Sequence, residues 1–561
     1  MSRRAAIVFF ACTLAAVAIA FPSSPALAAW PAGGIVVSEA YRLDSALLYG
    51  NGPCNLVRAA DGSIVLVASP TSPSSYAWNV SRVSANGDTL PGWPRTGTRV
   101  WGYLRGYDDH YFGSAITPSG DVFWSFGNAT TLTLQKVTNA GTLPTAYTSW
   151  SPASPVSSLF GASLAAGAVG DAFVSWRNRV QRVLGTGAVA PGWPAAGFTT
   201  ATSGIESAAM ADGSGGVIVL AGGIGLVPRV TRVDSNAVLH TGWPTGGRAL
   251  CSAASADRSL LEIRHRLVRT DATHGMALWV DGGTSAIRLQ RFSFSGALDP
   301  AWGPDGVEIE TASPTFGCEM VADGFGGAWI GYEFGDLPVL AHLLSDGPID
   351  AQFSPLDDGA VYRSQYRNAQ KLNALAFDAA PDGGVFFAWS DLRQAGFEQV
   401  RWRRFAADGS PHPAEPTAGR VVETFPLTPT YTGNTRAIAS DGEGGVYVAR
   451  DLGSPIKLHH EVPFTALGVP PSAPRAGLLL RAPAPNPVRD AITLRFSLPD
   501  ARPATLTLFD VAGRALHTSQ ASGAGEHTVR WDDAGALSPG LYLAQLRQGA
   551  EQRTARVVVT R

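Results

Sequence analysis

Charge and long apolar runs are scarce in this chain of 561 residues. Charged residues make up 16% of it and the formal net charge is −2, so no strong electric field draws nucleic acid or an anionic membrane. Beyond residue 28, no stretch is long and apolar enough to cross a bilayer as a helix. These absences argue against a nucleic-acid-binding protein and against a transmembrane protein.

The first 28 residues are different, because they have the pattern of a secretory signal peptide. Two arginines lie near the start, residues 5–20 are apolar, and residues 26–28 read Ala-Leu-Ala, a small-residue cleavage site. A retained membrane anchor is the alternative, but the run is short for a span and the Ala-Leu-Ala ending favours removal. We therefore expect a protein that is secreted, extracellular or attached to the outer cell surface.

Cysteine is nearly absent. Of the four cysteines, Cys12 lies in the predicted leader, so Cys54, Cys251 and Cys318 remain. Their spacing does not suit zinc, and an odd number leaves at least one thiol without a disulfide partner. Cys54 and Cys318 precede the first strands of two different repeats. We interpret all three as small buried residues, and a disulfide stays an open alternative.

The chain also lacks the short motifs that mark common catalytic sites. It has no Gly-x-Ser-x-Gly elbow, no phosphate-binding loop and no His-Glu-x-x-His. The Ser-x-Asp-x-Gly-x-x-Trp box of sialidases does not occur either. We therefore predict no catalytic residue, no metal site and no cofactor. Two carboxylates from distant repeats could still meet, which keeps an enzyme as an alternative.

Glycine and proline, by contrast, are abundant, with 63 and 39 residues, and they delimit a repeated unit. Its clearest copy is residues 207–250. An Asp-Gly turn at Asp212 precedes a β-branched run at 217–220, an alternating strand at 227–233, and a Trp-Pro element at Trp243 before a last short strand. This pattern predicts a meander of four antiparallel strands. One such sheet cannot bury both faces alone, so copies must stack.

Other copies share the turn, the strand after it and the Trp element. The turns recur at Asp61-Gly62, Ser119-Gly120, Asp323-Gly324, Asp382-Gly383 and Asp441-Gly442, with less regular versions near residues 167–171 and 271–275. The Trp elements recur at Trp93, Trp193 and Trp302. Four strands every roughly 45–60 residues predict an all-β fold, the β-propeller. Counting the turns favours eight blades, and seven is the alternative.

The two ends of the repeat array complement each other. The last unit, from about residue 437, stops before its Trp element and last strand. The predicted mature chain begins with that missing piece, because residues 30–37 carry Trp30-Pro31 and an apolar run. We expect this N-terminal strand to complete the last blade and leave no unpaired sheet edge. The predicted propeller spans residues 29–471, and a linker at 472–477 lies in a proline-rich stretch.

Propellers usually bind ligands at one end of the central channel, where loops join the last strand of one blade to the first strand of the next. Three such segments are long here and rich in aromatic and charged groups, which suit a glycan or a peptide. The candidate ligand-binding residues are Tyr103, Arg105, Tyr107, Asp108, Asp109, His110, Arg258, Arg264, Tyr366 and Arg367. A merely polar surface is the alternative for all of them.

Several tempting features have simpler interpretations. Asp108, Asp109 and His110 are adjacent, and three adjacent residues rarely converge on one metal ion. The repeated Asp-Gly turns lack the Asp-x-Asp spacing of a calcium loop and suit hairpins. The Trp elements are expected to lie between blades. His459 and His460 face opposite ways on a strand, so we interpret them as surface histidines.

Beyond the proline-rich stretch, residues 478–561 have a different pattern. Alternating segments predict the strands of a small all-β sandwich, with Asp510 and Gly513 in a hairpin turn and Trp531 in the core. The predicted strands are 491–496, 504–509, 515–518, 526–531, 540–546 and 552–559.

This segment also carries a family pattern. Asn486-Pro487, Leu508-Phe509-Asp510-Val511-Ala512-Gly513-Arg514 and Leu537-Ser538-Pro539-Gly540-Leu541-Tyr542 occur in this order. The pattern resembles the immunoglobulin-like domain shared by flagellar hook-capping proteins and type IX secretion sorting domains. The resemblance implies that residues 478–561 are an address read by secretion or attachment machinery. A purely structural module is the alternative. The repeats resemble, less specifically, those of secreted bacterial propeller proteins, which implies no activity.

Together these features predict a secreted or surface-displayed propeller that binds a ligand without catalysis and carries a C-terminal sorting domain. An extracellular polysaccharide hydrolase or lyase, with its site at the channel mouth, is one alternative. A structural spacer without a ligand is the other.

Overall fold

The structure is a computed structural model. It describes residues 30–31, 34–38, 41–42, 56–70, 77–101, 110–127, 132–144, 152, 162–201, 204, 206–223, 225–252, 266–281, 286–310, 316–334, 337–347, 349–356, 376–391, 393–412, 415–416, 418–426, 436–450, 456–462, 479–480, 488, 491–498, 502–511, 513–523, 525–532, 534–549 and 551–560. These residues form strands and two short 3-10 helices, η1 Pro300–Trp302 and η2 Ala534–Ala536. Within them there is no α-helix, so the fold is all-β.

The described residues up to position 462 form eight antiparallel sheets, S1 to S8. The first four are S1 (β2 Tyr41–Arg42, β3 Leu56–Arg58, β4 Ile64–Pro70, β5 Ala77–Val83, β6 Thr98–Trp101), S2 (β7 His110–Ile116, β8 Val122–Gly127, β9 Leu132–Val137), S3 (β10 Ser163–Ala166, β11 Ala172–Trp176, β12 Arg179–Val183, β13 Phe198–Thr199) and S4 (β14 Glu206–Ala211, β15 Val217–Gly223, β16 Leu226–Val233, β17 Arg248–Ala249). The others are S5 (β18 Arg266–Arg269, β19 His274–Val280, β20 Ile287–Ser293, β21 Val307–Glu310), S6 (β22 Phe316–Ala322, β23 Ala328–Phe334, β24 Leu337–Leu343, β25 Ile349–Phe353), S7 (β26 Ala376–Ala379, β27 Val385–Asp391, β28 Phe397–Phe405, β29 Arg420–Pro426) and S8 (β30 Arg436–Ser440, β31 Val446–Arg450, β32 Ile456–Glu461, β1 Ile35–Ser38).

Sheet S4 shows why the repeat folds as it does. The β-branched run predicted at residues 217–220 lies in β15, whose residues are all buried, as expected for a strand covered on both faces. The next strand, β16, alternates more between buried and half-buried positions. Gly213 has φ +79°, a backbone conformation that glycine adopts without strain, in the turn before β15. The predicted meander of four strands is confirmed for this unit.

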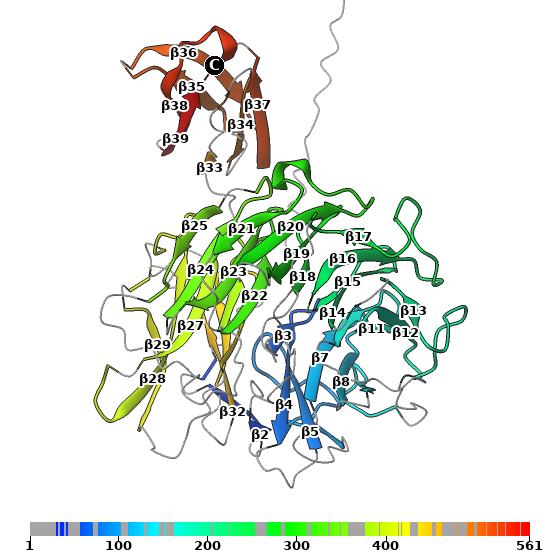
Figure 1. Cartoon of the computed structure of the whole chain (residues 1–561). Coiled ribbons are helices and arrows are strands. Elements are labelled where there is room, and N and C mark those ends of the chain that lie inside the picture. Colours follow the sequence, from blue (N-terminus) through cyan, green and yellow to red (C-terminus); the bar gives the residue numbers. More distant parts are fainter. Residues whose placement is uncertain are drawn as a thin grey trace, which may run out of the picture.

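Eight clusters of buried apolar side chains hold the sheets together, and each joins two consecutive sheets. They link S1 to S2, S2 to S3 and so on to S7 and S8, and the eighth links S8 back to S1. The first strand of each sheet contacts the first strand of the next, from β7 of S2 to β30 of S8, and β30 contacts β3 of S1. These first strands therefore lie at the centre of a ring. In Figure 1 the sequence colours run once around this ring. The arrangement is a β-propeller. Its blade number stays a prediction, because the sheet count covers the described residues alone.

The last sheet takes its outer strand from the N-terminal end of the chain. β1 pairs antiparallel with β32, with Ile35 opposite Leu458 and Val36 opposite Lys457. In the cluster behind this pairing, Ile35 and Val37 pack with Tyr447 of S8 and with Leu56 of S1. Burial of these side chains therefore joins residues more than 400 positions apart in the sequence. The predicted boundaries of the propeller and linker stay predictions.

The Trp elements connect neighbouring sheets, as expected. Each indole N–H donates to the backbone carbonyl of the second residue in the turn that follows the third strand of the next sheet. We call that acceptor the turn carbonyl. The pairs are Trp30 with Ala85 at 2.9 Å, Trp93 with Asn139 at 2.8 Å, Trp193 with Ser235 at 2.9 Å, Trp243 with Phe294 at 3.0 Å and Trp302 with Ser345 at 3.1 Å.

A second contact recurs in all eight described sheets. An aspartate in the loop between the first two strands pairs with a basic side chain on the third strand. The basic residue always lies opposite the second or third residue of the middle strand, next to the loop. The pairs are Asp61–Arg82, Asp121–Lys136, Asp171–Arg182, Asp212–Arg232, Asp271–Arg291, Asp323–His342, Asp382–Arg404 and Asp441–His460.

Several of these basic groups also reach the next sheet. Arg182 donates to the turn carbonyl of Ser235 at 2.8 Å, and Arg232 donates to that of Phe294 at 2.9 Å. Each of these two carbonyls therefore accepts from an indole and from a guanidinium of the preceding sheet. The Asp-Gly turns thus do more than reverse the chain, because their carboxylates hold the cations that connect one sheet to the next.

Residues 479–560 form a sandwich of two sheets. The strands are β33 Leu479–Leu480, β34 Ile492–Leu498, β35 Ala504–Phe509, β36 Ala515–Ala521, β37 Gly525–Trp531, β38 Gly540–Gln548 and β39 Glu551–Val559. One sheet has the order β33-β34-β37 and the other β36-β35-β38-β39. Leu494, Phe496, Leu506, Leu508 and Leu546 lie in the core between them.

In the sandwich the predicted turn at Asp510 and Gly513 is confirmed, whereas Trp531 is less buried than expected. Asp510 and Gly513 do form the predicted turn, since the Gly513 N–H donates to the Asp510 carbonyl at 2.9 Å and Gly513 has φ +80°. Trp531 is not a fully buried core residue. It packs at the core's edge, donates to the Ser519 hydroxyl at 3.1 Å and stacks on His517, because β37 is an edge strand of its sheet.

Candidate functional site

The sequence-predicted ligand-binding residues lie almost wholly outside the described part of the chain. This holds for Tyr103, Arg105, Tyr107, Asp108, Asp109, Arg258, Arg264, Tyr366 and Arg367, and also for Cys54 and the predicted leader. His110 begins β7, and its backbone lies opposite Gly127. These assignments therefore stay predictions.

The described strands do fix where the three segments attach. Residues 102–109 follow β6 and precede β7, residues 253–265 lie between β17 and β18, and residues 357–375 lie between β25 and β26. Each segment thus runs from the last strand of one sheet to the first strand of the next. In an antiparallel meander that end of the sheet also carries the turn between the second and third strands. We call it the connection end; the Asp-Gly loops and Trp turns lie at the opposite end.

Charged side chains described at the connection end form ion pairs within their own sheets. Asp391, at the end of β27, is 1% exposed and pairs with Arg393 at 2.5 Å and with Arg401 at 3.1 Å. Asp281 after β19 pairs with Arg288 at 3.0 Å. Both aspartates follow a Trp by two positions, as Asn178 does in S3. This Trp-x-Asp/Asn pattern therefore anchors hairpins, and sequence inspection could have found it.

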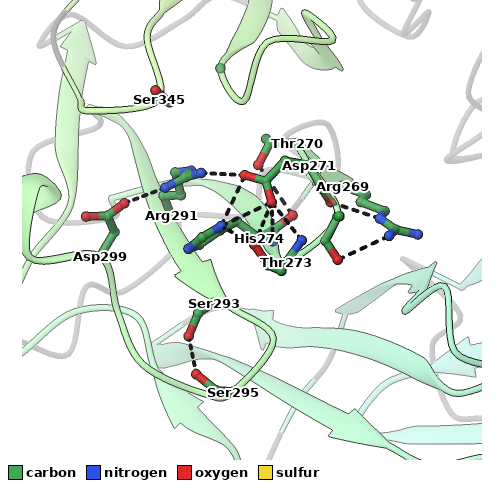
Figure 2. A network of polar contacts seen from close by, with 12 residues as sticks. Arg269, Thr270, Asp271, Thr273, His274, Arg291, Ser293, Ser295, Asp299 and Ser345 are labelled. Carbon is green, nitrogen blue, oxygen red and sulfur yellow. Dashed lines mark hydrogen bonds and ion pairs between the residues drawn. The ribbon is translucent and has the colours of Figure 1, made fainter. Parts of the chain in front are cut away.

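The opposite end carries a polar network centred on Asp271 in the first loop of S5 (Figure 2). Asp271 Oδ1 accepts from the backbone N–H of Thr273 at 2.7 Å and of His274 at 2.9 Å. Its Oδ2 accepts from Arg291 at 2.6 Å, and Arg291 also reaches Asp299 at 2.6 Å. Burial acts to raise the pKa of Asp271, but hydrogen bonds from Thr273 and His274 hold it well below the usual value.

This network resembles a catalytic triad in composition but not in geometry. The Thr273 hydroxyl and the Asp271 carboxylate both contact the same nitrogen of His274, Nδ1, at 2.9 Å and 3.1 Å. A triad needs the nucleophile and the carboxylate on different ring nitrogens, so that the imidazole can relay a proton between them. We therefore interpret the Asp271 network as the fifth copy of the structural Asp–cation pair.

The two adjacent histidines are not surface residues, contrary to expectation. His459 is 2% exposed and its Nε2 lies 3.3 Å from Glu423 of S7. His460 stacks on Tyr447 and its Nε2 lies 3.0 Å from Asp441. They do face opposite ways, as the strand geometry requires. Both are covered because β32 is flanked by S7 on one face and by S1, with Trp30, on the other.

Among the described residues, no group of three or more His, Cys, Asp and Glu side chains is arranged to hold a metal ion. Among the same residues, no helix has the length and apolar character that crossing a membrane requires. Cys251 and Cys318 are buried, 7% and 2% exposed, in different apolar clusters, as interpreted from the sequence.

The outer face of the sandwich sheet β36-β35-β38-β39 is a further candidate site that sequence reasoning missed. Along β38, residues 542, 544 and 546 face the core, whereas Leu541 and Leu543 face outward and are 43% and 37% exposed. Phe509 lies opposite Leu543, and Val558 lies opposite Leu541. Val511 follows in the turn after β35 and is 77% exposed. The alternation in residues 540–548 is the signal that could have revealed this face.

The sandwich is the part of the chain that matches a known family. Residues 484–560 match the family described as "Secretion system C-terminal sorting domain". The match indicates that the chain is secreted and attached at the cell surface. The curated proteins include no match to this chain.

Some solved structures are similar to the chain at low identity. Prolyl oligopeptidase B from Galerina marginata is 9% identical over 75% of this chain and 56% of its own, with a TM-score of 0.39. The chain thus spans little more than half of that enzyme. A fucose-specific lectin from Aleuria aurantia is 10% identical over 64% of this chain and 100% of its own, with a TM-score of 0.31. The β-propeller assignment follows from the sheets themselves.

Proposed function

We propose that the chain is a surface-displayed propeller that binds an extracellular glycan or peptide at its connection end, without catalysis. Its C-terminal sandwich delivers it to the surface and holds it there. Delivery to the cell surface is supported by the match of residues 484–560 to a secretion sorting domain. The three aromatic and charged segments support ligand binding, because the described strands attach them all at the same end of their sheets.

The described charged groups support a binding role over chemistry. Catalytic carboxylates need a cleft where substrate and water reach them, whereas Asp391 and Asp281 at the connection end are paired with arginines of their own sheet. The Asp271 network at the other end lacks a triad's geometry. Recognition would then fall to the long segments, where Asp108 and Asp109 sit among tyrosines and an arginine.

The test is a glycan and peptide array probed with the purified mature protein, residues 29–561. We expect binding to one ligand class, and at least tenfold weaker binding in the Asp108→Ala and Asp109→Ala variants. Asp88→Ala is the matched control, because Asp88 is exposed in the turn at the opposite end of the same sheet, S1. Unchanged binding in both Asp108→Ala and Asp109→Ala would remove this segment as the site.

The same preparation separates the two alternatives. Release of shorter products from any bound polysaccharide would identify a hydrolase or lyase. If no ligand on the array binds and the protein still reaches the cell surface, the propeller serves as a spacer that holds the surface of the cell at a distance from its surroundings.

A further inference from the structure

We propose that the outer face of the sandwich carries the docking surface for a secretion-system protein, and that this partner offers apolar groups with an acidic side chain beside them. The inference rests on the proposed sorting function of the sandwich and adds which of its surfaces is recognised. We call the surface the apolar patch; its residues are Phe509, Val511, Leu541, Leu543 and Val558.

The patch is contiguous because of the strand register. Leu543 on β38 lies between Phe509 on β35 and Arg556 on β39, while Leu541 lies beside Val558. Directly opposed residues on one face of an antiparallel pair have Cβ atoms about 4.5–5.5 Å apart, so these side chains touch. None of them is needed for the core, which is filled from the inner face by Leu506, Leu508 and their neighbours.

The other end of the same outer face is polar. There Thr507 lies opposite Gln545, and Thr505 lies opposite Arg547. A sheet face that only meets water is expected to carry polar side chains along its whole length. Apolar side chains gathered at one end, with polar ones at the other, are typical of a protein interaction site.

The charges around the patch indicate the partner's chemistry. Of the three arginines in β38 and β39, Arg556 borders the patch, and its side chain is exposed. Arg556 is directly beside Leu543. Arg514, whose side chain is 78% exposed, follows Val511 in the same turn and pairs with Asp510 at 3.2 Å. Arginines on the rim of an apolar surface favour a partner with carboxylates at matching positions.

The same charges argue against a second copy of this chain as the occupant. A two-fold pairing of the patch with itself would bring the rim arginines of one copy toward those of the other. Like charges facing each other across an interface cost free energy, so self-association is the less favourable arrangement.

Export of the full chain from a bacterium with a type IX secretion system tests the proposal. The Leu541→Thr/Leu543→Thr variant keeps good strand formers and replaces two of the five apolar side chains of the patch, and we expect its surface-exposed fraction to fall at least tenfold. Gln545→Thr, on the same strand and face, is the control and should be exported normally. The thermal unfolding midpoint of each purified variant shows whether the sandwich still folds.

A charge reversal provides the second, independent variant. Arg556→Glu should lower export severalfold, whereas Arg553→Glu should not, because Arg553 is exposed on the same strand but belongs to the opposite face. Normal export of both the threonine variant and Arg556→Glu would overturn the docking surface.

Two further measurements distinguish a wrong sorting function from a wrong docking surface. If removal of residues 484–560 leaves export unchanged, the sorting function itself is wrong; if that removal blocks export while the patch variants are normal, only the docking surface is wrong. A mature protein that is dimeric by light scattering and becomes monomeric in Leu541→Thr/Leu543→Thr would make a second copy the occupant, and would also overturn the proposal.

Discussion

The indole N–H of Trp30 donates to the carbonyl oxygen of Ala85 at 2.9 Å, from the last sheet of the ring to the first. The hydroxyl of Tyr447 donates to the same oxygen at 3.3 Å. Trp30 also contacts the rings of Tyr447 and His460. The ring is therefore closed by the same indole-to-turn-carbonyl contact that joins S3 to S4 and S4 to S5, although here one partner lies at the start of the described chain.

Removing this closing contact should destabilise the whole ring. For Trp30→Phe we expect a loss of about 1 kcal/mol, the usual net value of a hydrogen bond, because the ring contacts are kept. For Trp30→Ala we expect a loss of about 3 kcal/mol, at the low end for a truncated aromatic, because Trp30 is only half-buried. Urea unfolding of the mature protein measures both. Equal stability of Trp30→Ala and the native protein would mean that β1 is not needed for closure.

The Asp–cation pair of S4 should tolerate a change of cation but not its loss. Arg232 donates to buried Asp212 at 2.9 Å and to the Phe294 carbonyl of S5, and Lys136 fills the same role in S2. We expect Arg232→Lys to cost about 1 kcal/mol, because lysine keeps the positive charge but makes fewer hydrogen bonds than the guanidinium. Arg232→Met should cost about 3 kcal/mol or more, because it leaves the carboxylate of Asp212 buried without its cation. Chemical denaturation of the three proteins at pH 7 measures the difference, and similar losses in both variants would contradict the role of the charge.

The strands and the ring closure could be predicted from the sequence because they depend on local chemistry. The β-branched run Val217-Ile218-Val219-Leu220 is typical of a strand buried on both faces, and it lies in β15. The last repeat lacks its Trp element and its last strand; Trp30-Pro31 and the strand after it supply both, and that strand pairs with β32.

The Asp–cation pairs could not be predicted from the sequence in the same way, because the aspartate occupies different positions along the loop in different repeats. Asp212 comes directly after β14, whereas Asp171 comes directly before β11, so the S3 copy looked irregular in the sequence. In space the two carboxylates meet Arg232 and Arg182, which occupy equivalent places opposite Ile218 and Phe173. Loops of different backbone conformation can bring a carboxylate to the same place beside the cation. The recurring contact is therefore not accompanied by a fixed number of residues between the aspartate and its strands.

The burial of His459 and His460 was missed for a different reason. Strand alternation determines which face each side chain takes, and the sequence predicts this part correctly. Whether a face is covered depends on the neighbouring sheets, which come from residues far away in the sequence, such as Glu423 and Trp30. The candidate ligand-binding segments stay predictions, because the described residues determine only where they attach.

Glu423 should make the S7–S8 contact sensitive to acid. Burial acts to raise the pKa of this carboxyl, but His459, Lys457 and Arg450 around it lower the pKa to about 2. A carboxyl whose pKa is lower in the folded state stabilises the protein above its unfolded value of 4.5, and that contribution is lost as the pH falls toward 2.

Glu423→Gln should therefore be clearly less stable than the native protein at pH 7, by about 3 kcal/mol, since it leaves the buried guanidinium of Arg450 without its anion. The difference should shrink steadily between pH 4.5 and pH 2. Urea unfolding of both proteins across this range measures it. A difference that is constant with pH would show that packing, and not charge, makes the contribution.

His342 should make the S6–S7 contact sensitive to base. Its Nε2 lies 3.1 Å from Asp323 and its Nδ1 lies 2.8 Å from the turn carbonyl of Ala407, so both nitrogens face acceptors and both carry protons. Burial acts to lower the pKa of His342, but the carboxylates of Asp323 and Asp350 and the Ala407 carbonyl raise it to about 9. The ring also stacks on Trp329 at 4.3 Å.

A histidine whose pKa is higher in the folded state stabilises the protein fully below its unfolded value of 6.5, and this contribution is lost as the pH rises through about 9. The shift corresponds to about 3 kcal/mol at most. We expect His342→Gln to be less stable than the native protein at pH 6 and to approach it by pH 10, because Gln cannot carry the charge. His240→Gln, in a half-exposed pair with Asp234, is the control and should show a much smaller change. A gap between native and His342→Gln that persists unchanged to pH 10 would show that the imidazole contributes through stacking on Trp329 and not as a cation.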